Sequence, residues 1–327
     1  MQNIYQDSIV IDGLNVSNWE SEQALKGVYD GQVTAINATT AIFENYNQAM
    51  DNISGWYRRF HAHSDMLTHI TSVQDIHDAK RDGKSGVIFG WQNASPIEND
   101  LDRIEQFKIL GVRIIQITYN ERNLIGNGCY ERNDDGLSNF GRDAVRQMNR
   151  LGILIDLSHV GDRTTLEAAD LSDKPVAATH ANARSFVDHP RNKTDDALKL
   201  IAERGGIIGV TSWPPFLPNK FKSTLRDFGD AIDDMVERVG IDHVGVGNDY
   251  TIGQSKEWFD TLMAQQGTKW NPRRLDYPDT VTHPRGIETP DKLPCLADEL
   301  LSRGYKEVDI KKILGGNFLR IFQETWD

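Results

Sequence analysis

The chain has 327 residues, of which 39% are hydrophobic, and its formal net charge is −12 at pH 7. This length suits two ordinary domains or one barrel, and 39% hydrophobic residues suffice for a large core. The acidic balance argues against a nucleic-acid backbone or an anionic membrane surface as a partner.

The two cysteines, Cys129 and Cys295, lie far apart and form no C-x-x-C motif. They build no disulfide framework and fit a reducing compartment. Residues 1–10 contain no basic segment, and no apolar stretch approaches the roughly 18 residues that a membrane span needs. We therefore expect no signal peptide, no membrane span and a cytoplasmic location.

Short apolar, β-branched runs recur along the chain and predict strands that are buried on both faces. In chain order they cover 8–12, 32–36, 86–89, 112–118, 153–157, 176–179, 207–211 and 244–247. Helical patterns between and after them cover 101–110, 140–151, 164–171, 195–203, 225–239 and parts of 290–322. This alternation predicts an α/β protein with about eight parallel strands, a (β/α)₈ TIM barrel. We expect residues 1–327 to form one domain, with long loops or a lid over 256–294.

Polar side chains follow several of these predicted strands. The strand over 153–157 leads into His159, the strand over 176–179 into His180, and the strand over 244–247 into Asp249. The carboxyl ends of barrel strands meet on one face, and active sites lie there. Two imidazoles and a carboxylate are a plausible ligand set for a divalent metal with an open position. The alternative is that each histidine is structural and binds a loop carbonyl.

Three further features have two readings each. Arg191 lies in the loop after His180. Its guanidinium is suited to bind a substrate carboxylate through two hydrogen bonds, and the alternative is that it is a surface loop arginine. Asp156 lies inside an apolar strand, so its carboxylate needs a hydrogen-bonding partner. That partner is either an imidazole of the candidate site or a group with a purely structural role. The motif His61-x-His63-x-Asp65 looks like a metal motif, but alternate positions on a helix do not share a face. We expect that segment to be a solvated helix.

Longer motifs resemble a known family. They are GVRIIQITYNERN from Gly111, GLSNFGRDAVRQMNRLGILIDLSHV (136–160), PVAATHANAR (175–184), HPRN (189–192), VGVGNDY (244–250) and GGNFLRIF (315–322). Together they resemble the membrane dipeptidase (renal dipeptidase) family of the amidohydrolase superfamily. The resemblance implies a (β/α)₈ barrel, a binuclear zinc site, hydrolysis of dipeptides with free carboxylates, and often a homodimer.

Carried over by motif, the resemblance assigns roles to four residues. His159 and His180 match the two histidines of the second zinc. Arg191 matches the substrate-binding arginine, and Asp249 matches the aspartate that activates the water or the leaving group. Tyr119 stands where the family has a histidine on the substrate side, so we expect it to contact substrate.

The chain departs from the family pattern at the first zinc. Leu14 and Val16 stand where the family has a histidine and an aspartate, and Gln92 where it has a bridging glutamate. Leu14 and Val16 cannot coordinate a cation, and a neutral amide is a poor bridge between two cations. We expect at most one zinc ion, at His159 and His180, and a substrate-binding role for Gln92.

Three hypotheses follow. The first is a metallodipeptidase-like hydrolase that acts on a dipeptide or an N-acyl amino acid. The second is a catalytically silent barrel that binds a small amino-acid-like ligand. The third is a metal-free lyase or isomerase that uses His159, Asp249 and Tyr119 for acid–base chemistry.

Overall fold

The computed structural model describes residues 4–263 and 281–326 of the chain, and within them a single parallel sheet curls into a barrel. Its strands are β1 (Ile11–Asn15), β2 (Ala35–Ala41), β3 (Leu67–Ile70), β4 (Ser85–Trp91), β5 (Val112–Gln116), β6 (Leu154–Asp156), β7 (Ala177–Ala178), β8 (Ile207–Val210) and β9 (Val244–Val246). The strand order is β2-β1-β9-β8-β7-β6-β5-β4-β3. Because β2 also pairs with β4, the ring closes with eight strands and leaves β3 beside it.

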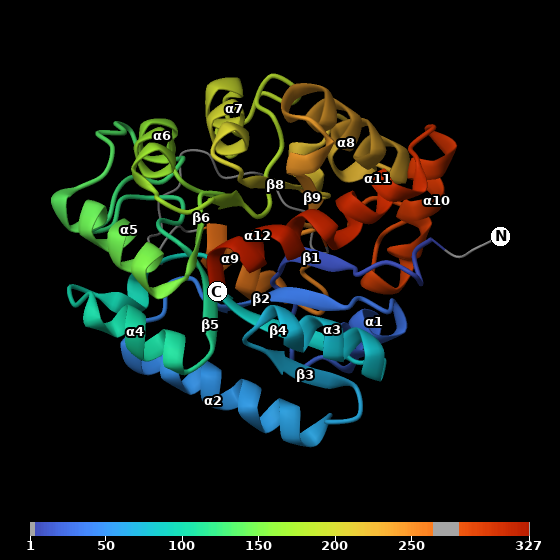
Figure 1. Cartoon of the computed structure of the whole chain (residues 1–327), viewed down its shortest axis with the longest axis horizontal. Helices are drawn as coiled ribbons and strands as arrows, with labels where there is room; N and C mark the ends of the chain where they lie inside the picture. The colour runs from blue at the N-terminus through green and yellow to red at the C-terminus, as the bar shows by residue number, and fades with distance from the viewer. Residues whose placement is uncertain (1–3, 264–280, 327) are drawn as a thin grey trace.

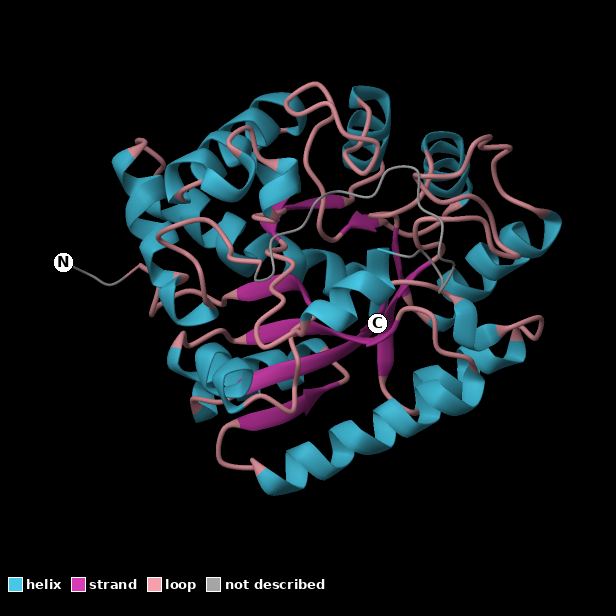
Figure 2. Cartoon of the chain, turned by 180° about the vertical axis from the view of Figure 1, so that it is seen from behind, coloured by secondary structure: helices cyan, strands magenta, loops and turns pink. Residues whose placement is uncertain are grey.

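Helices surround the barrel (Figures 1 and 2). They are α1 (Glu22–Asp30), α2 (Tyr46–Ala62), α3 (Val73–Asp82), α4 (Asp102–Ile109), α5 (Asn139–Leu151), α6 (Asp162–Leu171), α7 (Asp195–Glu203), α8 (Leu225–Val239), α9 (Lys256–Met263), α10 (Pro294–Ser302), α11 (Glu307–Lys311) and α12 (Asn317–Trp326). The predicted (β/α)₈ barrel is thereby confirmed. Within the described part of the chain, none of these helices combines the length and the apolar character that crossing a bilayer requires.

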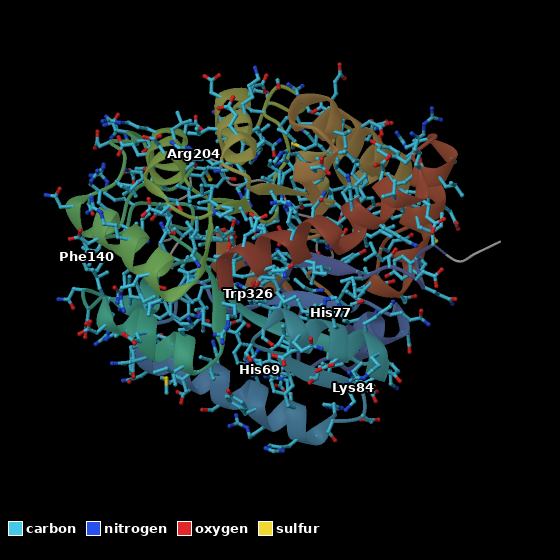
Figure 3. The ribbon with its side chains drawn as sticks, viewed as in Figure 1. His69, His77, Lys84, Phe140, Arg204 and Trp326 are labelled. Atoms are coloured by element: carbon cyan, nitrogen blue, oxygen red, sulfur yellow. The ribbon has the colours of Figure 1, made fainter. Side chains whose placement is uncertain are left out.

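The last helix, α12, closes one end of the barrel, and Trp326 at its end is labelled in Figure 3. The fully buried ring of Phe318 packs so tightly against β1, β8 and β9 that a Cβ atom at Gly13, Gly209 or Gly245 would lie 2.6, 3.2 or 2.7 Å from it. These three glycines therefore make room for the ring. The site must form at the other end, where the strands terminate.

The predicted strands were wrong in part. The strands expected over 8–12 and 32–36 begin three residues later, as β1 and β2, and β3 was not predicted at all. β3 contains the polar Thr68 and His69, so it lacks the apolar run that marks the other strands. His69 is accommodated because its ring lies 4.2 Å from the ring of Phe89 and 5.3 Å from that of Phe60.

The segments expected to be a solvated helix and a lid are described in part. α2 ends at Ala62, so His61 lies on the helix and Asp65 lies in the turn after it. Both side chains are exposed to solvent as expected, but the helix expected for the whole His61-x-His63-x-Asp65 motif is wrong. The expected loops over 256–294 include α9, a 3-10 helix over Pro290–Lys292 and the first residue of α10, whereas 264–280 lie outside the described residues.

Candidate active site

Two histidines face each other at the carboxyl end of the barrel. His159 follows β6 and His180 follows β7, and their Nε2 atoms lie 3.1 Å apart. Both side chains are buried. The sequence prediction that neighbouring strand ends bring these two residues together is therefore correct in its geometry.

Hydrogen bonds on the far side of each ring decide where the imidazole protons sit. Thr179 donates its hydroxyl proton to Asp156, over 2.6 Å, and its Oγ1 atom lies 2.8 Å from Nδ1 of His180. His180 therefore donates its Nδ1 proton to Thr179. Asn120 Oδ1 lies 2.7 Å from Nδ1 of His159 and accepts the proton there. Each neutral ring then turns a lone pair on Nε2 toward the other ring, which is the arrangement that two imidazoles adopt around a cation.

Burial keeps both imidazoles neutral. It lowers the pKa of His159 and of His180 well below 6.5, and the charge of Arg191 lowers the pKa of both further. The guanidinium of Arg191 donates to the backbone carbonyls of Ser158 and His180, the latter over 2.7 Å. Two of its donors are thus already used, and its Nε is buried without a partner among the described residues. A role for Arg191 in binding a substrate carboxylate stays a prediction.

The spacing of the two histidines fits one metal ion. Two nitrogens bound to one tetrahedral zinc at about 2.0–2.1 Å lie roughly 3.3 Å apart, close to the 3.1 Å between these Nε2 atoms. Over 4–263 and 281–326, no three His, Cys, Asp or Glu side chains gather into a metal-binding group. Catalytic zinc sites generally have three protein ligands, and the charge of Arg191 opposes a cation. The donor set therefore fits a single, weakly held ion and does not fit a pair.

Tyr119 and Gln92 lie at the same end of the barrel. The ring of Tyr119 stacks on that of His159, with 4.1 Å between their centroids. Gln92 follows β4, is buried, and donates from Nε2 to the hydroxyl of Thr39 over 3.0 Å. Its backbone carbonyl accepts a hydrogen bond from Gln116 of β5. Both residues therefore lie at or next to the candidate site, and their contact with substrate stays a prediction.

Asp249 supplies a carboxylate beyond β9. Burial raises the pKa of its carboxyl group to about 6, although the charge of Arg191 acts in the opposite direction. Its backbone has a φ of 62°, in the left-handed region that non-glycine residues seldom adopt. Such strain is common at functional positions. A carboxyl group with a pKa near neutrality suits proton transfer.

Leu14 near the end of β1 and Val16 directly after it are apolar, at the positions where the family pattern has zinc ligands. A register shift between Asp12 and Asn15 marks a bulge in β1, and bulges re-aim the side chains next to them. Leu14 is buried, and Val16 packs in a cluster with Ile42, Tyr119 and Leu262. Leu262 belongs to α9, so this helix covers one side of the barrel mouth.

Sequence reasoning missed several residues of the site. Asn120 and Thr179 set the imidazole protons, and each directly adjoins a residue that was predicted, Tyr119 or His180. That adjacency was the available signal. Trp258 and Leu262 of α9 carried no signal, because their contacts with Val16 and Ile42 join positions more than 200 residues apart in sequence.

Comparisons with known proteins identify the family and the fold. The family model of the membrane dipeptidases (peptidase family M19) matches residues 2–271 and 275–327. The dipeptidase tcpJ of Claviceps purpurea is 30% identical over 269 residues, which cover 81% of this chain and 57% of that protein. The chain thus spans little more than half the length of this curated relative.

Two solved structures from Pseudomonas aeruginosa share the fold. An amidohydrolase superposes with a TM-score of 0.94 at 40% identity, over 99% of this chain and 98% of that one. The probable dipeptidase PvdM superposes with a TM-score of 0.83 at 21% identity, over 99% of this chain and 97% of that one. At 21% identity, the second comparison supports the fold alone.

Proposed function

Because the chain belongs to the membrane dipeptidase family, we propose that it hydrolyses the amide bond of a dipeptide or an N-acyl amino acid. The observation that carries the proposal is the 3.1 Å separation of the two Nε2 atoms at the barrel mouth. The names of its relatives, a dipeptidase and an amidohydrolase, favour a hydrolase over a silent barrel or a lyase.

The proposal includes one zinc ion between His159 and His180, which supplies Lewis acidity toward the amide carbonyl when it is bound. Asp249 accepts a proton from the attacking water and returns it to the leaving amine. Tyr119 packs against His159 and restricts water around the pair. Asp156, through Thr179, holds the ring of His180 in place.

The remaining parts of the proposal concern the wider context. We place the protein in the cytoplasm as a homodimer that acts on a small peptide-like substrate. The acidic net charge of −12 is consistent with a soluble protein that has no nucleic-acid partner.

The experiment measures zinc content and hydrolysis in the same samples. We expect zinc to bind in equilibrium dialysis up to one ion per chain as its concentration is raised, and we expect release of amino acid from a panel of dipeptides and N-acyl amino acids. His159→Ala combined with His180→Ala should lose both the zinc and the activity. His77→Ala, at an exposed histidine on α3 (Figure 3), is the matched control. Bound zinc that survives the double substitution, or the absence of hydrolysis across the panel with zinc bound, would overturn the proposal.

A further inference from the structure

A pocket of about 310 Å³ opens beside the barrel mouth, between the loop after β2 and helix α9. Its apolar wall consists of Ile42, Phe43, Trp258 and Leu262. This volume is at the low end of the range for small-molecule sites. The pocket therefore suits one portion of a ligand, such as a side chain or a short acyl chain.

The pocket shares part of its wall with an apolar cluster that borders the candidate active site. Ile42 and Leu262 line the pocket and also pack against Val16 and Tyr119. Tyr119 in turn stacks on His159 at 4.1 Å. A ligand that reaches from the histidine pair to the pocket would therefore contact this apolar cluster.

The cluster is apolar at this point because Val16, the residue directly after β1, is apolar. Val16 is 7% exposed and packs within this cluster. An aspartate at position 16 would place a carboxylate in this apolar cluster and would disfavour an apolar ligand group there. At position 16, the loss of the family's metal ligand and the apolar character of the cluster are therefore the same change.

Charge decides which half of a substrate enters the pocket. Glu44 is the one charged residue among the described residues that line it. Its carboxylate accepts hydrogen bonds from the backbone N–H groups of Ile42 and Phe43, at 2.6 and 3.0 Å. A carboxylate at the rim repels the free carboxylate of a dipeptide or N-acyl amino acid. The carboxylate half of the substrate is thus directed elsewhere.

We infer that this pocket binds the acyl half of the substrate, and that it selects an N-acyl amino acid with an aliphatic acyl chain or a dipeptide with a large apolar first residue. The inference rests on the proposed function for the identity of the two halves. Ile42, Trp258 and Leu262 are then residues that determine specificity.

The test uses N-alkylsulfonylglycines with methyl, propyl and pentyl chains, whose sulfonamide bond resists hydrolysis. Their affinity for the purified protein is measured by calorimetry. We expect the affinity to rise by about fourfold for each methylene that is buried. Leu262→Ser should flatten this series and lower the affinity for the pentyl compound by at least tenfold. Leu124→Ser is the matched control, because Leu124 is a 55% exposed leucine that lines a separate pocket.

Hydrolysis of N-acetylglycine and N-hexanoylglycine is measured in parallel. A flat series in the parent protein, or equal effects of Leu262→Ser and Leu124→Ser, overturns the inference even when hydrolysis occurs. A rising series that Leu262→Ser flattens, together with no hydrolysis of any substrate, supports the pocket and overturns the proposed function instead. Thermal midpoints of the two serine variants confirm that both are folded.

Discussion

The hydroxyl oxygen of Thr179 lies 2.8 Å from Nδ1 of its neighbour His180 and 2.6 Å from a carboxylate oxygen of Asp156. The direct separation between His180 Nδ1 and Asp156 is 4.0 Å, too long for a hydrogen bond. Thr179 is therefore the link through which a buried carboxylate fixes the tautomer of the imidazole.

Thr179→Val should weaken this link while preserving the volume of the side chain. Without the hydroxyl, nothing holds the proton on Nδ1 of His180, and its Nε2 lone pair is no longer directed at His159. We expect zinc affinity and kcat/KM to fall by about 10- to 100-fold, as for other residues that orient metal ligands. Competition with a chromogenic chelator measures the affinity. Thr179→Ser should restore both quantities, and a Val variant that binds zinc like the parent would contradict this role.

Asp249 should control the acidic limb of the pH–rate profile. Because burial raises the pKa of its carboxyl group to about 6, the ionised form that accepts a proton is depleted below that pH. We expect kcat/KM to fall about tenfold per pH unit below about pH 6 and to level off above it. Asp249→Asn should lower kcat/KM by at least 100-fold. An unchanged acidic limb in the residual activity of this variant would assign the titration to another group.

The barrel and the histidine pair were accessible to sequence reasoning for the same physical reason. Strands buried on both faces produce apolar runs, and a polar residue at the end of such a run lies at the carboxyl end of the sheet. His159 and His180 satisfy both conditions. β3 fails the first condition because Thr68 and His69 interrupt it, and it was missed.

The remaining part of the site depends on tertiary contacts that no local pattern records. The packing of Leu262 against Ile42 and Val16 joins α9 to the first two strands. The bulge in β1 is likewise a property of its pairing with β2. The resemblance to the family does mark Leu14 and Val16 as departures from its pattern. The apolar cluster around Val16, however, depends on tertiary packing, which the motif does not show.

The combination Leu14→His, Val16→Asp and Gln92→Glu should create a second metal site. It supplies the histidine, the aspartate and the bridging carboxylate that the family pattern has at these positions. We expect the zinc content to rise from at most one to nearly two ions per chain by elemental analysis. Without zinc, the variant should unfold at a lower temperature than the parent, because new polar groups replace packed apolar ones. Zinc should recover part of that loss.

A zinc content that remains at one ion or fewer would show that the site lacks more than these three ligands. Leu14→Ala combined with Val16→Ala is the control, because it removes the same apolar groups without adding ligands. We expect it to lower the thermal midpoint and to leave zinc content unchanged. The control therefore distinguishes binding of a second zinc ion from a general loss of packing at the barrel mouth.

Asp12 should make the protein less stable as the pH rises from about 4 to about 7. Its Oδ1 atom accepts the backbone N–H of Asn248 over 2.8 Å, but burial outweighs this bond and raises the pKa of the carboxyl group to about 7. An unfolded chain has an aspartate pKa of about 3.9. Between these two values the folded state binds the proton and the unfolded state does not, so the free energy of unfolding falls with increasing pH. The stabilisation that the folded state gains from holding this proton is complete below about pH 4 and is lost above about pH 7.

Asp12→Asn removes this titration and keeps an oxygen that accepts the hydrogen bond from Asn248. We expect the variant to exceed the parent in stability at pH 8 by an amount on the order of 2–4 kcal/mol, since each pKa unit corresponds to about 1.4 kcal/mol. The advantage should shrink steadily toward pH 4. Urea unfolding at several pH values gives the difference directly, with Asp51→Asn, at an exposed aspartate of α2, as the control. A stability difference that is independent of pH would show that Asp12 is ionised in the folded protein throughout this range.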